Sequence, residues 1–170
     1  LWDIPKRKKI RSIDTVTKDS GWSSPQTPSK IHPDGKLMAI YQEGQIEVWN
    51  ILTGKVQSYY KGGQNGISFN KNGSLLAGLG KDTVSIWDIT TGEKLYEMGN
   101  NGWGRNGIEL SPDGSMVALT LGGIQIRETK TGDVLHISAG HSPMIFSPDG
   151  TLLAYGNGHQ IIIQNVSSGE

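Results

Sequence analysis

Histidines and acidic residues are the side chains of this 170-residue chain that could bind a metal ion or move a proton. The four histidines are His32, His136, His141 and His159. None lies at metal-ligand spacing from a second histidine or within a carboxylate motif, so we expect no metal site. Cysteine is absent, which excludes a disulfide framework and any thiolate ligand.

Glycine-rich loops are a second feature that could carry chemistry, because the chain has 24 glycines. It has no Gly-x-Ser-x-Gly elbow, no Walker loop and no dinucleotide fingerprint, and its glycines lie in predicted hairpin turns. Three aspartates, Asp34, Asp113 and Asp149, stand inside Pro-Asp-Gly triplets, where aspartate is a turn former. We therefore predict no catalytic residue, no cofactor and no enzyme activity.

The strongest cluster of charge is Lys6-Arg7-Lys8-Lys9, followed by Arg11. Such a run can act as a nuclear-localisation signal or contact phosphates, but a solvated edge strand or loop is its commoner meaning. Sixteen basic and sixteen acidic residues give a formal net charge of zero, so nucleic-acid binding is not expected. No run approaches the roughly 20 apolar residues of a membrane helix. Because the charged N-terminus is also unlike a signal peptide, we expect a cytoplasmic protein without a membrane partner.

Two turn markers, each recurring about every 40 residues, show how the chain is organised. The first marker occurs as Pro33-Asp34-Gly35, Lys71-Asn72-Gly73, Pro112-Asp113-Gly114 and Pro148-Asp149-Gly150. The second occurs as Thr53-Gly54, Thr91-Gly92, Thr131-Gly132 and Ser168-Gly169. Proline presets φ, aspartate caps its own backbone and glycine takes the left-handed position, so the Pro-Asp-Gly marker predicts a hairpin turn.

Short apolar segments surround these turns and predict four strands in each unit. A first strand ends just before the Pro-Asp-Gly turn, and a near-continuous apolar second strand follows it, as in Leu75-Leu76-Ala77. A third strand alternates in polarity, as in Val84-Ser85-Ile86-Trp87, and a weaker outer strand follows the Thr-Gly turn, as in Lys94 to Met98. Four antiparallel strands repeated at this period predict an all-β chain of propeller blades.

The ends of the third strands resemble the WD-repeat family. They read Leu1-Trp2-Asp3, Val48-Trp49-Asn50 and Ile86-Trp87-Asp88, and the resemblance covers essentially the whole chain. It implies structural roles for Trp49, Asp82, Trp87 and His141, because the family joins histidine, aspartate, hydroxyl and tryptophan in a buried network. No unit here contains the complete set, so we expect apolar packing between blades to supply most of the stability.

The resemblance also implies a ring of seven or eight blades, of which this chain supplies about four. Residues 1–8 are interpreted as the remnant of a preceding blade and a linker. The predicted blade units are 9–54 with an insertion at 15–30, 55–92, 93–132 and 133–170. Since the chain begins in mid-motif without methionine, we interpret it as an arc that another copy or the remainder of the propeller completes.

In WD-repeat proteins, the loops entering the first strand and those joining the second and third strands form the usual docking face. The residues expected to project there are Trp22, Gln26, Glu43, Gln64, Lys81, Trp103 and Arg105. Trp103 and Arg105 are the best pair, because tryptophan and arginine are enriched at binding hot spots.

The leading hypothesis for function is a non-catalytic scaffold that holds other proteins. One alternative is a regulatory or sensory module attached to an effector such as a kinase. Another is a segment of a propeller enzyme whose catalytic groups lie outside this sequence.

Overall fold

The computed structural model describes residues 2–3, 8–9, 28–99 and 107–170, and every regular element within them is a β-strand. Among these residues no helix is long and apolar enough to cross a membrane. The all-β prediction is confirmed. Of the basic run, Lys8–Lys9 forms strand β2, which pairs antiparallel with β1 (Trp2–Asp3), while Lys6, Arg7 and Arg11 lie outside the described residues.

Fifteen further strands form four antiparallel sheets, each built from strands consecutive in the sequence. The first sheet contains β3 (Ser29–Ile31), β4 (Leu37–Gln42), β5 (Gln45–Asn50) and β6 (Lys55–Lys61). The second contains β7 (Gly66–Phe69), β8 (Leu75–Leu79), β9 (Thr83–Asp88) and β10 (Lys94–Gly99). The third contains β11 (Ile108–Leu110), β12 (Met116–Thr120), β13 (Ile124–Glu128) and β14 (Val134–Ser138). The fourth contains β15 (His141–Phe146), β16 (Leu152–Asn157) and β17 (Gln160–Asn165).

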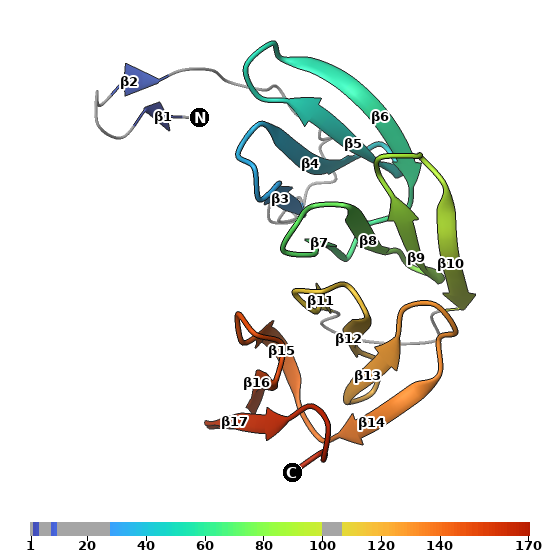
Figure 1. The fold of residues 1–170 in the computed structure, drawn as a ribbon, viewed down its shortest axis with the longest axis vertical. Helices are drawn as coiled ribbons and strands as arrows, with labels where there is room; N and C mark the ends of the chain where they lie inside the picture. The colour runs from blue at the N-terminus through green and yellow to red at the C-terminus, as the bar shows by residue number, and fades with distance from the viewer. Residues whose placement is uncertain (1, 4–7, 10–27, 100–106) are drawn as a thin grey trace, which may run out of the picture.

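The four sheets stand side by side in an arc, as the blades of a propeller do (Figure 1). Their first strands, β3, β7, β11 and β15, lie on the inner side of the arc, and the last strands β6, β10 and β14 lie on the outer side. The fourth sheet contains three described strands, whereas each of the other three contains four. The predicted propeller architecture is thus observed.

The sheets are offset by one strand from the units predicted from the sequence. Residues 55–61 open the second predicted unit, yet they form β6, which pairs with β5 of the first sheet. The Thr-Gly turn causes this offset because it is a tight hairpin, in which the Gly54 N–H donates to the Asn50 carbonyl at 2.8 Å. Each predicted unit therefore supplies the outer strand of one blade and the inner strands of the next. Similarly, the predicted insertion at 15–30 ends inside β3, whose first residues are Ser29 and Lys30.

The Pro-Asp-Gly turns have the predicted geometry. Gly35 has a φ of 71°, and the Lys36 N–H donates to the Asp34 carboxylate at 2.7 Å. The corresponding N–H groups of Ser115 and Thr151 donate to Asp113 and Asp149 at 3.0 and 3.1 Å. These carboxylates therefore serve the turn itself, as expected of Asx turns.

Three apolar clusters fill the spaces between successive sheets. Trp87 and Leu76 of the second sheet pack on Ile46 and Val48 of the first. The cluster between the second and third sheets contains Ala77, Leu79, Val84, Ile86, Ile108, Leu110, Val117 and Leu119. The cluster between the third and fourth contains Ala118, Ile124, Ile126, Phe146, Leu153, Tyr155 and Val166. Since full burial of one large apolar side chain contributes about 1.5–3 kcal/mol, these clusters dominate the packing between blades.

Candidate functional site

A groove lies between the first two sheets at the end where second strands lead into third strands. Because the strands are antiparallel, the β4–β5, β6–β7 and β8–β9 loops all reach this end. The groove has a volume of about 370 Å³. Its lining residues are Tyr41, Gly44, Lys61, Gly62, Gln64, Gly80, Lys81, Asp82, Thr83 and Glu97.

The predicted docking-face residues fall into two groups. Gln64 and Lys81 line the groove, together with Asp82, which the family resemblance had singled out for a structural role. Glu43 directly precedes the lining residue Gly44 in the β4–β5 hairpin. The other four, Trp22, Gln26, Trp103 and Arg105, lie outside the described residues.

Glu43 has its position fixed by the hairpin. Its φ is 49° and that of Gly44 is 90°, so both central residues of the two-residue turn are left-handed, as in a type I′ hairpin. Few residues other than glycine adopt a positive φ. Gln42 and Gln45 pair across this turn. The hairpin therefore presents Glu43 at its tip, beside the groove.

Backbone and amide hydrogen bonds hold the loops around the groove in one arrangement. The Asn65 side chain donates to the Gly80 carbonyl at 3.0 Å, and its backbone N–H donates to Leu79 at 2.8 Å. The Gly62 N–H reaches the Gly44 carbonyl at 3.2 Å. Gly63 has a φ of 91°, and a Cβ there would overlap the Ile46 side chain, so only glycine lets this loop lie against the sheet.

The charges of the groove are mixed. Glu97 accepts hydrogen bonds from Lys94 at 2.7 Å and from the Ser85 hydroxyl at 3.0 Å. The Lys94 hydrogen bond, followed by that of Ser85 and the charge of Lys61, lowers the pKa of the Glu97 carboxyl. The lining thus contains two lysines, Lys61 and Lys81, and two carboxylates, Asp82 and Glu97. No cluster of three metal-ligating side chains occurs among the described residues.

Sequence reasoning did not anticipate Asn65, Thr83 or Glu97 at this site. A signal for the first of these exists, because Asn65-Gly66-Ile67 recurs as Asn106-Gly107-Ile108 in the next unit. The positions of Thr83 and Glu97 follow only from strand register, in which Thr83 pairs with Gly99 and Ser85 pairs with Glu97.

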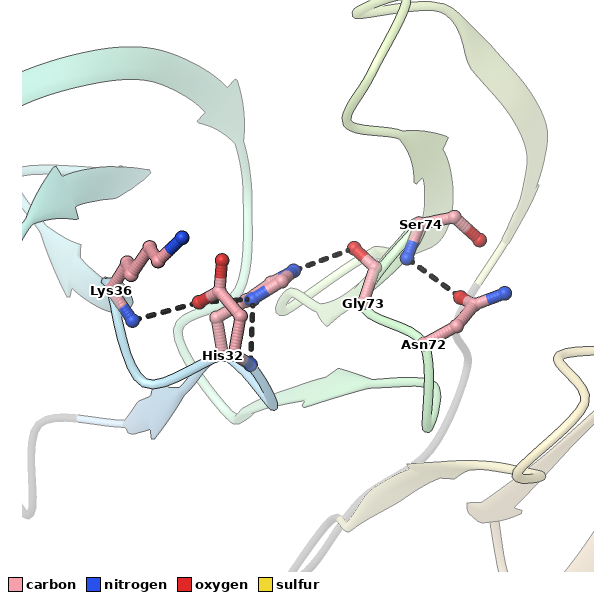
Figure 2. A network of polar contacts seen from close by, with 6 residues as sticks. His32, Lys36, Asn72, Gly73 and Ser74 are labelled. Carbon is pink, nitrogen blue, oxygen red and sulfur yellow. Dashed lines mark hydrogen bonds and ion pairs between the residues drawn. The ribbon is translucent and has the colours of Figure 1, made fainter.

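At the opposite end of the sheets, His32 joins the first two blades (Figure 2). Its imidazole is buried, with Nε2 3.0 Å from the Gly73 carbonyl oxygen and Nδ1 2.8 Å from the Asp34 carboxylate. The edge of the ring also meets Phe69, with centroids 5.2 Å apart. No role was predicted for His32, although it occupies the same position before the turn as Asn70, Ser111 and Ser147.

Those three counterparts form a recurring polar contact of their own. Asn70, Ser111 and Ser147 each accept an N–H from the residue five positions later, at 2.9 Å in every case. His32 instead reaches across to the neighbouring blade. The residue directly before the Pro-Asp-Gly-type turn therefore makes a polar contact in every blade, whereas the family places its polar network on the histidine of a Gly-His pair.

The residues to which the family resemblance gave structural roles occupy different environments. Trp87 is buried and packs on Tyr60, with ring centroids 5.3 Å apart. Trp49 is half-buried and donates to Glu47 at 2.9 Å. Asp82 lines the groove. His141 is exposed at the start of β15, where its Nδ1 lies 2.9 Å from the Ser142 carbonyl oxygen.

The units without tryptophan use a polar side chain at the same third-strand position. Arg127 donates to the Gly132 carbonyl at 2.9 Å, and Gln164 donates to the Gly169 carbonyl at 2.8 Å. Gln164 also accepts from the Ser138 hydroxyl of the preceding sheet at 2.9 Å. In these two units, the side chain at the tryptophan position therefore hydrogen-bonds to the glycine carbonyl of the following Thr-Gly or Ser-Gly turn.

The inner strands of three blades meet in a polar contact. Lys30 of β3 lies 3.7 Å from the Glu109 carboxylate of β11, and the Ser68 hydroxyl of β7 donates to Glu109 at 3.3 Å. Burial raises the pKa of the Glu109 carboxyl, against the opposing effect of Lys30. Glu109 thus links the first strands of the first three blades, on the inner side of the arc.

Comparison with known proteins identifies the fold. No protein-family model matches the sequence, and no curated protein matches it. Among solved structures, the chain is similar to the β-propeller domain of Myceliophteria thermophila Cps50 (Swd1), with a TM-score of 0.74 and 15% identity over 88% of this chain and 54% of that one. It is also similar to Kuenenia stuttgartiensis hydrazine synthase, with a TM-score of 0.67 and 19% identity over 91% of this chain and 50% of that one. The chain therefore has a β-propeller fold and spans about half the length of each neighbour.

Proposed function

We propose that this chain is a non-catalytic interaction scaffold, built on WD-repeat-like propeller blades, which binds partner proteins at the groove between its first two blades. The observation that carries this proposal is the gathering of Gln64 and Lys81, with Glu43 beside them, around one groove. All three belong to the docking face that the resemblance to WD-repeat proteins implies.

The physical character of the groove supports binding rather than turnover. Its loops are held by Asn65 and by the Gly63 turn, so a partner meets a preorganised surface and loses little free energy in ordering it. Its lysines and carboxylates offer charge-assisted hydrogen bonds to a polar or charged segment of a partner protein. Adjacent charges of both signs favour partners with a complementary pattern.

Site-specific photo-crosslinking tests the proposal. A photoreactive amino acid replaces Gln64 in one variant and Lys130, an exposed residue in the turn at the opposite end of the third blade, in the matched control. We expect a discrete adduct with another protein from position 64 only, and we expect Lys81→Glu to reduce its yield. Equal adducts from both positions, or none from position 64, would contradict the proposed face.

A second candidate function is a structural part of an enzyme, because one similar structure is a hydrazine synthase. In that case the catalytic groups would belong to sequence outside this chain. Activity assays on the longer polypeptide, with and without residues 1–170, distinguish the candidates. A turnover rate unchanged by deletion argues against the enzyme role.

A further inference from the structure

The exposed face of the last sheet is the counterpart of the surfaces on which the other blades pack. In the first three sheets, the third strand directs two aliphatic residues at the following sheet, and all of these are 0–2% exposed. The pairs are Ile46 and Val48, Val84 and Ile86, and Ile124 and Ile126. Their counterparts in β17, Ile161 and Ile163, are 79% and 65% exposed.

Strand register extends this face across the whole of the fourth sheet. Ile145, Ala154 and Ile163 lie opposite one another on β15, β16 and β17, and the Ile145 side chain is 62% exposed. The alternate residues, including Phe146 and Leu153, are buried against the third sheet. One side of the fourth sheet thus packs on the third sheet. The other side carries aliphatic residues like those at the existing interfaces between blades, but no described residue covers it.

The three existing interfaces define what such a face binds. Each incoming blade presents a large apolar residue at the end of its first strand and another in its second strand. The first-strand residues are Phe69, Leu110 and Phe146, and the second-strand residues are Leu76, Val117 and Leu153.

The first sheet of this chain has the same two positions. They are occupied by Ile31, which is 57% exposed, and by Met38, which is half-buried. The chain therefore presents both a receiving face, on its fourth sheet, and an incoming face, on its first.

We infer that the Ile145–Ile161–Ile163 face binds the Ile31–Met38 face of a second copy of this chain. The two faces are complementary but different, so two copies joined head to tail make the contact twice and can close on each other. A formal net charge of zero places no long-range repulsion between the copies. This interface is separate from the groove, so its failure leaves the proposed docking function untouched.

Sedimentation equilibrium of the 170-residue chain tests the inference, with Ile163→Asp and Ile31→Asp as the disrupting variants. The matched control is Ile137→Asp, because Ile137 is 69% exposed on β14 and belongs to neither face. We expect a dimer whose dissociation constant rises more than about tenfold in either disrupting variant, since each buries a carboxylate against apolar side chains. The control should associate like the unsubstituted chain. Circular dichroism checks folding, which exposed positions should preserve.

Mixing the two disrupting variants gives a sharper result. A mixed pair retains one intact contact, between Ile31 of one copy and Ile163 of the other, so association should exceed that of either variant alone. A chain that stays monomeric at all concentrations overturns the inference, as does a dimer insensitive to Ile163→Asp. A dimer weakened by Ile163→Asp but not by Ile31→Asp overturns the head-to-tail arrangement, and so do assemblies that grow beyond two copies.

Discussion

Gly73 and Gly35 occupy the same turn position in successive blades, and replacing each by alanine should give unequal losses of stability. Both are left-handed, with φ values of 76° and 71°. A Cβ at Gly35 meets nothing within 4 Å, whereas a Cβ at Gly73 would overlap the imidazole of His32. Gly35→Ala therefore measures the backbone cost alone, and Gly73→Ala adds the disruption of the contact between blades.

The expected magnitudes follow from these contacts. The left-handed backbone costs an alanine about 1–2 kcal/mol at either site. Displacement of His32 from the Gly73 carbonyl costs about 1 kcal/mol more for the hydrogen bond, and loss of its edge contact with Phe69 costs about 0.5–1.5 kcal/mol. We expect Gly73→Ala to lower the free energy of unfolding by about 2.5–4.5 kcal/mol and Gly35→Ala by about 1–2 kcal/mol.

Urea unfolding followed by circular dichroism measures both losses, and a double-mutant cycle with His32→Ala isolates the contact. In the His32→Ala background the overlap is gone, so Gly73→Ala should cost no more than Gly35→Ala. The reasoning is refuted if the two glycine variants lose equal stability, or if removal of His32 leaves the difference between them unchanged.

Three further predictions concern single side chains. Trp87→Ala should lower the free energy of unfolding by about 3–5 kcal/mol, because Trp87 is buried between blades. Trp49→Ala should lower it by less, because Trp49 is only half-buried. Urea unfolding midpoints of the two variants test this difference. Hydrogen bonds from the Ser147 hydroxyl, and then from the N–H and hydroxyl of Thr151, lower the pKa of Asp149 to about 2, so the stabilisation from its ionised form is complete above pH 3.8 and is lost as the pH falls through about 2. NMR titration should find this pKa nearer 3.8 in Ser147→Ala, and an unchanged value would contradict the assignment. Burial raises the pKa of the Glu109 carboxyl, so at pH 7 the charged carboxylate lowers the stability of the folded state relative to the unfolded state. Glu109→Gln should therefore leave stability at pH 7 unchanged or higher; a clear loss of stability would show that the Lys30 contact dominates.

The repeat period and the turns could be predicted because they depend on local chemistry. Pro33-Asp34-Gly35 and its counterparts specify a hairpin through φ preferences and one carboxylate, whatever the rest of the chain does. The apolar runs of β8 and β12 likewise indicated burial on both faces, and both strands are almost entirely buried. Strand identity therefore followed from residues close together in the sequence.

Contacts between blades could not be predicted in the same way. The sequence places His32 before a turn but does not show that Gly73, 41 residues later, lies beside its ring. The groove is a similar case, because Lys61 and Thr83 meet there only through the stacking of the first two sheets. A single sequence specifies the period of the repeat, whereas the angle between neighbouring blades decides which side chains touch.

The sequential pairing of strands has a consequence for how the chain folds during synthesis. Every described strand pair joins neighbours in the sequence, so each loop closure is short and inexpensive in entropy. Proteins with such local contacts fold faster than sandwiches that need distant pairings. As the chain leaves the ribosome, each blade can form as soon as its outer strand emerges, and its exposed face then serves as the surface on which the next blade assembles.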